Sequence, residues 1–242
     1  MGGTTEASLL ATACASAGLP ATLSYAGRVA NPRQQPIPTR TGGFGGTEGL
    51  VRYLRDHAIT HLIDATHPFA ARMSHHAVDA ALATGVPLIA LQRPPWFQGP
   101  GDRWTQVADV AGAAKALAGP PRRVFLAIGR VHLATFASQP QHHYLLRLVD
   151  PPDGPLPLPN TTVVIARGPF TRHGDTDLLQ THDIDTVVAK NAGGSGADAK
   201  LSAARMLNLP VVLIDRPDLP DRLVTESIEA VIDWLHQTDL GV

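Results

Sequence analysis

The chain has 242 residues, 44% of them hydrophobic and 17% charged, with a formal net charge of −1; this is the composition of an ordinary globular protein with one large domain or two modest ones. The balanced charge argues against nucleic acid and anionic membranes as partners, since both select basic surfaces. One cysteine, Cys14, excludes an intrachain disulfide framework and a cysteine-based zinc site. There is no apolar run of about 18–20 residues and no signal-peptide layout, so we expect a cytoplasmic protein.

The first half of the chain alternates helical patterns with short apolar runs. Residues 5–17 have apolar side chains at helical spacing and end before Gly18, which suits the position after a helix. A strand is predicted over 21–25 and a proline-rich loop or edge strand over 31–41. The glycine-rich turn at 42–46 is predicted to lead into a helix with Leu50, Val51 and Leu54 on one face. Further strands are predicted over 61–65, 86–91 and 104–107, and further helices over 69–83 and 108–117.

The segment Gly119-Pro120-Pro121 is predicted to be a linker, because the alternation begins again after it. Strands are predicted over 124–128, 144–149, 162–166, 186–189 and 211–214. Helices are predicted over 131–137 and 176–182, from the glycine turn at 191–196 to residue 207, and over 226–236. Strands and helices that alternate over short links indicate parallel sheets with right-handed crossovers. We therefore predict an α/β protein of two Rossmann-like domains, residues 1–119 and 120–242.

Glycine-rich turns precede predicted helices three times, at Gly2-Gly3-Thr4, Gly42–Gly46 and Gly193–Gly196. At such turns, free backbone N–H groups and the helix dipole favour an anionic ligand such as a phosphate. None of the three is a complete G-x-G-x-x-G, and ordinary turn chemistry explains any one of them equally well. Their recurrence at strand–helix junctions is what points to an anionic ligand.

The end of the second predicted strand bears on the kind of dinucleotide. An acid there holds the ribose 2′-hydroxyl of NAD, whereas NADP needs a cation for its 2′-phosphate. The sequence Ser24-Tyr25-Ala26-Gly27-Arg28 has no acid and ends in arginine. If a dinucleotide binds, we expect the phosphorylated one; the alternative is a solvated surface arginine.

The segment Asp64-Ala65-Thr66-His67-Pro68 follows a predicted strand. Pro68 suits the first turn of a helix, so Thr66 and His67 are open to two interpretations, helix capping or contact with a ligand. The pairs His75-His76 and His142-His143 are predicted to be surface residues. No spacing of histidines and carboxylates supports a metal site.

Three cations close predicted strands of the second half: Arg130, Arg167 and Lys190. Because ligands of such folds sit at the carboxyl ends of strands, these residues predict a cleft for a polyanionic ligand; scattered surface cations are the alternative. A lysine there also lies where burial and dipoles tune its pKa.

Motifs along almost the whole chain resemble precorrin-6A reductase of corrin (cobalamin) biosynthesis. They are Gly-Gly-Thr-x-Glu-Ala at 2–7, Ala-Gly-Arg at 26–28, Gly-Gly-Phe-Gly-Gly at 42–46, Asp-Ala-Thr-His-Pro-Phe-Ala at 64–70, Ile-Gly-Arg at 128–130, Ala-Arg-Gly-Pro-Phe at 166–170 and Lys-Asn-Ala-Gly-Gly-Ser-Gly at 190–196. The resemblance implies an NADPH-dependent oxidoreductase of CH–CH bonds. It would reduce one double bond of precorrin-6A, or of its cobalt-bearing form, to give the 6B form.

The resemblance also implies site residues and partners. NADPH would lie on the first domain, against Gly2, Gly3, Thr4, Thr5, Gly27, Arg28, Gly42, Gly43, Gly45, Gly46, Thr66 and His67. The tetrapyrrole would bind mainly to the second domain, at Arg130, Arg167, Gly193, Gly194 and Ser195. Lys190 is expected to supply a proton or to stabilise the charge that develops during the reduction, and Asn191, the next residue, is the second catalytic candidate. Other enzymes of the corrin pathway are candidate partners.

Two rival functions are a non-catalytic nucleotide-binding module or sensor, and a short-chain-type dehydrogenase. The second would need a Tyr-x-x-x-Lys pair, which Tyr25, Tyr53 and Tyr144 do not form. The chain departs from the resemblance at its start, since the family has a short aliphatic strand directly before Gly-Gly-Thr. Four or five buried aliphatic residues contribute on the order of 10 kcal/mol. We therefore expect that Met1 is a misassigned start and that the protein begins upstream.

Overall fold

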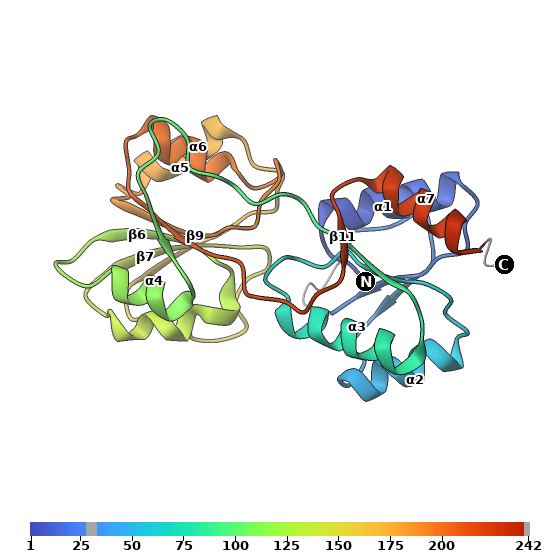
Figure 1. Ribbon diagram of the computed structural model, residues 1–242. Helices are drawn as coiled ribbons and strands as arrows, with labels where there is room; N and C mark the ends of the chain where they lie inside the picture. Colours follow the sequence, from blue (N-terminus) through green and yellow to red (C-terminus); the bar gives the residue numbers. More distant parts are fainter. Residues whose placement is uncertain (28–32, 240–242) are drawn as a thin grey trace. The chain divides into compact units, whose positions relative to one another are not determined.

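A computed structural model describes residues 1–27 and 33–239. It divides the chain into two compact units, Met1–Pro94 with Asp218–Val242, and Pro95–Pro217. Unit 1 contains two short parallel sheets and unit 2 contains one, and in each unit helices lie on both faces (Figure 1). The predicted fold class, α/β with two Rossmann-like domains, is confirmed.

Within its described residues, unit 1 has five short parallel strands. The strands are β1 (Leu23–Tyr25), β2 (Thr39–Thr41), β3 (Leu62–Asp64), β4 (Leu88–Leu91) and β11 (Leu223–Thr225). They pair as β1-β2 and as β11-β4-β3. The helices are α1 (Thr5–Ser16), α2 (Thr47–Asp56), α3 (Ala71–Thr84) and α7 (Ile228–Asp239). In Figure 1, α1 and α7 lie over one face and α2 and α3 over the other.

The first two residues join the two sheets of unit 1. The Met1 amino group donates to Ile63 O at 2.8 Å, and Met1 O accepts from Ala65 N at 3.0 Å. On the other side, Gly2 N donates to Ser24 O at 3.0 Å. The strands thus follow the order β2-β1, then Met1–Gly2, then β3-β4-β11. This is the doubly wound order 3-2-1-4-5-6, with Met1–Gly2 in the place of strand 1.

Unit 2 has one six-stranded parallel sheet in the order β5-β10-β9-β6-β7-β8. Its strands are β5 (Trp104–Val107), β6 (Arg123–Ala127), β7 (His143–Leu148), β8 (Thr161–Ile165), β9 (Thr186–Lys190) and β10 (Val211–Ile214). The helices are α4 (Val110–Ala116), the 3₁₀ helix η1 (Arg130–Ser138), α5 (Arg172–Thr181) and α6 (Ala199–Met206). Because β6 is followed in the chain by β7 but borders β9 on its other side, the strand order reverses between β6 and β9.

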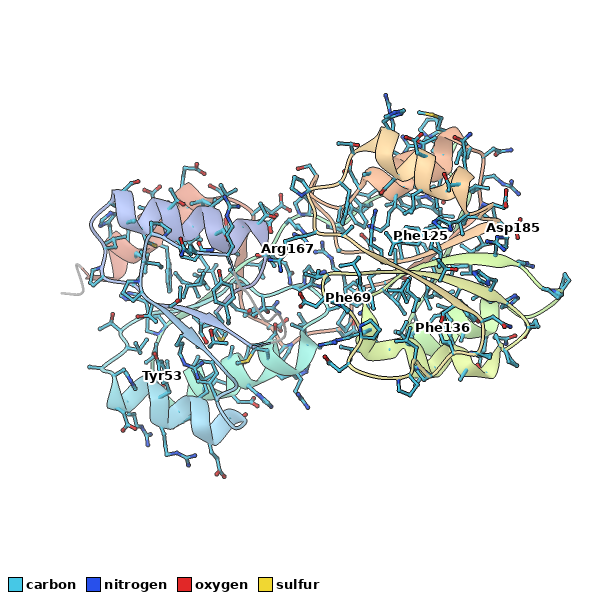
Figure 2. The ribbon with its side chains drawn as sticks, turned by 180° about the vertical axis from the view of Figure 1, so that it is seen from behind. Tyr53, Phe69, Phe125, Phe136, Arg167 and Asp185 are labelled. Atoms are coloured by element: carbon cyan, nitrogen blue, oxygen red, sulfur yellow. The ribbon has the colours of Figure 1, made fainter. Side chains whose placement is uncertain are left out.

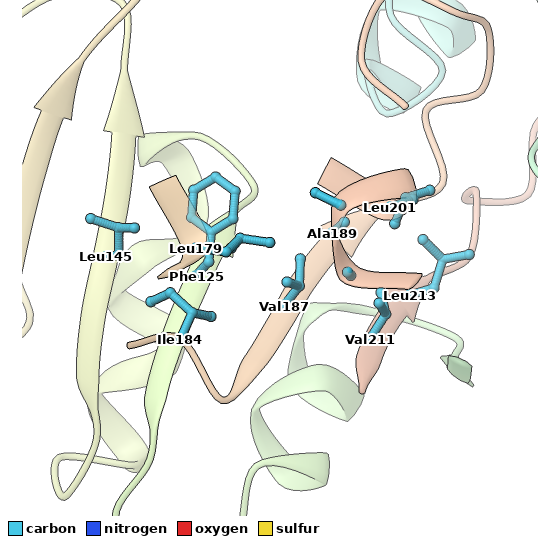
Figure 3. Packing of buried hydrophobic residues seen from close by; sticks show 11 residues of the cluster. Phe125, Leu145, Leu179, Ile184, Val187, Ala189, Leu201, Val211 and Leu213 are labelled. Atoms are coloured by element: carbon cyan, nitrogen blue, oxygen red, sulfur yellow. The ribbon is translucent and has the colours of Figure 1, made fainter. Parts of the chain in front are cut away.

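The central strands of unit 2 are apolar on both faces, as expected for a parallel sheet covered by helices on both sides. Phe125, Leu145, Val187 and Leu213 are each completely buried, and they lie with α5 and α6 in one cluster (Figure 3). The continuous runs that predicted these strands are therefore the runs that build the core.

The observed elements follow the predicted ones closely, but the units divide the chain differently from the predicted domains 1–119 and 120–242. The reason is strand pairing. β5 pairs with β10, which places residues 95–119 in unit 2, and β11 pairs with β4, which returns the C-terminal segment to unit 1. The Gly119-Pro120-Pro121 segment is a loop inside unit 2. β11 was not predicted, because three residues between proline-rich loops give no periodic signal.

No helix in the described ranges is both long enough and apolar enough to cross a membrane. Within the same ranges, no group of three His, Cys, Asp or Glu side chains is arranged to hold a metal ion.

Candidate active site

The glycine turn at the start of α1 lies at the carboxyl end of the unit 1 strands. Thr4 caps α1, because its hydroxyl accepts from Ala7 N at 3.1 Å and donates to Ala65 O at 3.0 Å. Gly3 has φ +132°, and a Cβ there would have no described atom within 4 Å. At Gly2 a Cβ would lie 2.6 Å from Ala7 Cβ. Glycine therefore permits the close packing of strand and helix at Gly2 and the unusual backbone at Gly3, in front of the α1 N-terminus.

Asp64, at the end of β3, holds the adjoining turn. Its carboxylate is only 3% exposed and accepts three hydrogen bonds. The donors are Thr66 N at 3.1 Å, Thr66 Oγ1 at 2.6 Å and Ser74 Oγ at 2.6 Å. His67 is exposed, and its Nδ1 accepts from Phe69 N at 3.1 Å. Both interpretations of the Thr66-His67 pair stay open: the two residues shape their turn, and Thr66 lines a small pocket together with Thr4.

An ion pair borders the same region. Arg93 donates to Glu6 at 2.9 Å, with side chains 13% and 23% exposed. Thr4, Glu6, Thr66 and Arg93 line one small pocket at the ends of β3 and β4. The pair offsets the negative charge of Glu6 in the first turn of α1, where an anionic ligand would otherwise be repelled.

The second glycine turn is braced by Arg40 of β2. Its guanidinium donates to Ser24 Oγ at 2.7 Å, to Gly42 O at 3.1 Å and to Gly43 O at 3.2 Å. It also lies 4.0 Å from the centre of the Phe44 ring, with Tyr53 of α2 (Figure 2) next to that ring. A cation is thereby fixed beside the end of β1.

Backbone geometry explains the glycines of this turn. Gly42, Gly45 and Gly46 have φ +127°, +84° and +90°, a region that other residues rarely adopt. Gly46 precedes α2 and gives it no side-chain cap. Arg28 lies outside the described residues.

In unit 2 the reversal of strand order brings Gly129 and Lys190 to neighbouring strand ends. Ala127 of β6 is directly opposite Ala189 of β9, so Ile128-Gly129-Arg130 and Lys190-Asn191 leave the sheet side by side. This is the position at which doubly wound sheets bind ligands. The segments that carry Arg130 and Lys190 therefore leave two adjacent strands.

Asn191 follows β9 and is 5% exposed. Its Oδ1 accepts from Trp96 N at 2.8 Å and its Nδ2 donates to Trp96 O at 3.0 Å. Trp96 Nε1 in turn donates to Gly194 O at 2.7 Å. On the other side, Arg216 donates to Asn191 O at 3.0 Å. The side-chain amide of Asn191, a catalytic candidate in the sequence, therefore binds the backbone N–H and C=O of Trp96. These contacts favour a positioning role for Asn191.

Gly193 and Gly194 both have φ +70°, and Ser195 follows them before α6. The Trp96–Asn191 contacts fix this turn directly after Lys190. Lys190, Asn191, Gly193, Gly194 and Ser195 therefore lie at the end of β9 and in the loop that follows it.

Arg167 follows β8, which is the edge strand of the sheet. Since neighbouring strands lie about 4.8 Å apart, β8 is about 10 Å from β6. The loop after Arg167 is held by Arg147, whose guanidinium lies 3.5 Å from the centre of the Phe170 ring and pairs with the buried Asp175. Arg130 is half exposed and lies 3.4 Å from Asp153. The cations thus span the sheet edge and do not form one cluster.

Comparison with known proteins gives concordant results. Residues 1–236 match the model of the family described as "Precorrin-6x reductase CbiJ/CobK". A precorrin-6A reductase of Rhodobacter capsulatus is 60% identical over 97% of this chain and 94% of its own length. The chain belongs to the precorrin-6x reductase family.

Further relatives of the precorrin-6x reductase family agree. A precorrin-6A reductase of Sinorhizobium is 48% identical over 97% of this chain and 92% of its own length. A cobalt-precorrin-6A reductase of Priestia megaterium is 27% identical over 78% of this chain and 77% of its own. A solved structure described as "CobK precorrin-6A reductase" has 60% identity and a TM-score of 0.95, covering 98% of this chain and 94% of its own. The resemblance read from the sequence motifs is therefore confirmed.

Two residues of the site were not found from the sequence. Arg40 stands in a loop-like stretch, and only its position two residues before a glycine turn hints at a role. Trp96 follows two prolines far from Asn191 in the chain, and no local pattern connects them. Long-range pairing of polar groups is the kind of contact that periodicity does not encode.

We expect Asn191→Ala to lower the free energy of unfolding by about 1–3 kcal/mol, because it leaves the partly buried N–H and C=O of Trp96 without their partners. Urea unfolding followed by circular dichroism measures the change. Asn160→Ala is the matched control, since that amide is exposed and makes one long contact of 3.4 Å to Pro140 O; it should cost less than about 0.5 kcal/mol. Equal losses in both variants would contradict the holding role.

Proposed function

We propose that this member of the precorrin-6x reductase family reduces precorrin-6A with NADPH to the 6B form. The observation that supports it most strongly is the likeness, over nearly the whole chain, to precorrin-6A reductases at 48–60% identity. The relative with a cobalt-bearing substrate in its name is much more distant, at 27%. We therefore propose the cobalt-free macrocycle as substrate.

The α1 glycine turn fits the pyrophosphate of a dinucleotide. Its backbone is open at Gly3, and the helix N-terminus points to the strand ends. The Thr4 hydroxyl is already engaged, because it caps the helix at Ala7 N and binds Ala65 O. First-turn N–H groups and the helix dipole attract phosphate oxygens. Thr5, Gly27 and the Gly42–Gly46 turn complete the proposed cofactor side, with Thr66 and His67 at the adjoining strand end.

Arg40 supports the choice of the phosphorylated cofactor. The end of β1, Ser24 to Gly27, contains no acid that would hold a ribose 2′-hydroxyl. The Arg40 guanidinium lies 2.7 Å from Ser24 Oγ at that place, and an arginine near the end of the second strand accommodates a 2′-phosphate. We assign this role to Arg40, in addition to Arg28, for which the sequence suggests the same role.

Reduction of a carbon–carbon double bond adds a hydride to one carbon and a proton to the other. NADPH supplies the hydride when bound. In unit 2, Lys190 is proposed to deliver the proton or to stabilise the developing negative charge, from a loop that Asn191 and Trp96 hold in place. Arg130, Arg167 and the N–H groups of Gly193, Gly194 and Ser195 are proposed to bind the acetate and propionate groups of the macrocycle.

The direct test supplies precorrin-6A and NADPH to the purified protein. We expect the absorbance of the reduced nicotinamide to fall together with conversion of the tetrapyrrole, which mass spectrometry detects as a gain of two hydrogens. A nucleotide-binding sensor would bind NADPH without oxidising it. Binding without turnover would therefore reject the proposed function in favour of that alternative.

We expect Arg40→Ala to raise the KM for NADPH about 10–100-fold, because charge-assisted hydrogen bonds to a phosphate are each worth about 1.5–3 kcal/mol. The KM for NADH should change little. Arg52→Ala removes an exposed cation from α2 and is the control. If Arg40→Ala raises the KM for NADH as much as the KM for NADPH, Arg40 only braces the turn and does not bind the 2′-phosphate.

We expect Lys190→Met to lower kcat about 10²–10⁴-fold, the range for loss of a general acid, while the KM for NADPH stays near its original value. Steady-state kinetics with both substrates separates the two constants. Lys115→Met, on the exposed side of α4, should leave both unchanged. An unaltered kcat in Lys190→Met would remove Lys190 from the reaction.

A further inference from the structure

Arg40 lies in a cluster of aromatic side chains to which no role has been assigned so far. Its guanidinium carbon is 4.0 Å from the centre of the Phe44 ring and 5.1 Å from the centre of the Tyr53 ring. The two rings contact each other edge to face, with their centres 5.2 Å apart. A cation over the face of an aromatic ring is attracted by the partial negative charge of that face. The rings therefore hold the charged end of Arg40 in addition to packing against each other.

Gly49, the third residue of α2, explains how Phe44 reaches this position. A Cβ at residue 49 would lie 1.6 Å from the carbonyl oxygen of Phe44 and 2.7 Å from its carbonyl carbon. The glycine turn can therefore pack against α2 only because residue 49 has no side chain. Tyr53 is four positions further along the helix, so it lies on the same face as Gly49. The backbone of Phe44 is thus fixed over Gly49, and its ring meets Tyr53.

Arg40 uses only part of its hydrogen-bonding capacity within unit 1. A guanidinium has five N–H donors. Two donors of Nη1 bind Ser24 Oγ and Gly42 O, and one donor of Nη2 binds Gly43 O. The Nε–H and the second N–H of Nη2 make no hydrogen bond to a residue that the structure describes. Two N–H groups of one guanidinium suffice to bind two oxygens of a phosphate.

The contacts of Arg40 order its side chain before any ligand binds. A mobile arginine loses rotamer freedom when it binds a phosphate, and this loss lowers the affinity. Arg40 is held on one face by Phe44 and at its Nη atoms by three oxygens. Its backbone is fixed as well, because it pairs with Ser24 in the β1–β2 register. A side chain that is ordered in advance binds its ligand more tightly without any new contact.

We propose that Phe44 and Tyr53 are positioning residues that set the preference of unit 1 for NADPH over NADH by acting through Arg40. The proposal rests on the role of Arg40 in the proposed function, and it extends that role to two side chains that need not contact the cofactor. NADPH and NADH differ only by the 2′-phosphate. A group that acts through Arg40 therefore changes the affinity for NADPH alone, whereas a merely structural role of the rings would change both affinities alike.

The test measures the dissociation constants of NADPH and NADH by nicotinamide fluorescence, with no tetrapyrrole present. Phe44→Leu keeps an apolar side chain but removes the aromatic face. We expect it to lower the preference for NADPH about 3–10-fold, a range typical of a lost cation–π contact. Phe44→Tyr should retain the preference, and Tyr53→Leu should lower it less, because that ring is farther from the guanidinium. Phe97→Leu, in unit 2 and 78% exposed, is the control and should change nothing.

A double-mutant cycle shows whether the rings act through Arg40. Once Arg40→Ala has removed the guanidinium, Phe44→Leu should not change the preference for NADPH any further. An equal effect of Phe44→Leu with and without Arg40 would overturn the proposal, and so would a lowered Tm with an unchanged preference.

The same measurements separate this proposal from the proposed function, because they require no turnover of precorrin-6A. A preference that Arg40→Ala does not change would overturn the assignment of Arg40, and the positioning role of the rings with it. A preference that Arg40→Ala lowers and Phe44→Leu does not would overturn the positioning role alone.

Discussion

Everything proposed for unit 1 depends on the parallel pairing that passes through Met1 and Gly2. Three backbone hydrogen bonds connect this segment to β1 and β3, and they set the direction in which the chain enters α1. Gly2 and Gly3 then turn the chain without a side chain, so the N–H groups of the first turn face the strand ends. A phosphate site of this kind depends on the position of the backbone, and the pairing of Met1 and Gly2 sets that position.

The elements were predictable because their signal is local. The runs 124–128, 186–189 and 211–214 are apolar except for Thr186 and correspond almost residue for residue to β6, β9 and β10. The division into units was not predictable, because it depends on β5 joining β10 and β11 joining β4, pairings between segments about 100 residues or more apart. The proline-rich segment near residue 119 looks like a linker, although it only connects α4 to β6.

The site was predictable in its positions and less so in its roles. The sequence predicted glycines and cations at strand ends. The strand registers explain why the segments that carry Arg130 and Lys190 leave adjacent strands, while Arg167 follows the edge strand β8. It did not find Arg40, whose guanidinium reaches Ser24 on the adjacent strand. Such a contact follows from the β1–β2 register, in which Arg40 is directly opposite Ser24.

The polar side chains at the strand ends share one structural task. Asp64 binds the N–H and hydroxyl of Thr66, Thr4 binds Ala65 O, and Asn191 binds both peptide groups of Trp96. Each of these side chains makes at least one hydrogen bond to the backbone of a turn, and Asp64 also accepts from the hydroxyls of Thr66 and Ser74. The turns they hold present backbone N–H groups and a few cations to solvent. A polar residue beside a glycine turn is therefore as readily a support for the site as a participant in it, and hydrogen-bond partners, which only the fold supplies, decide between the two.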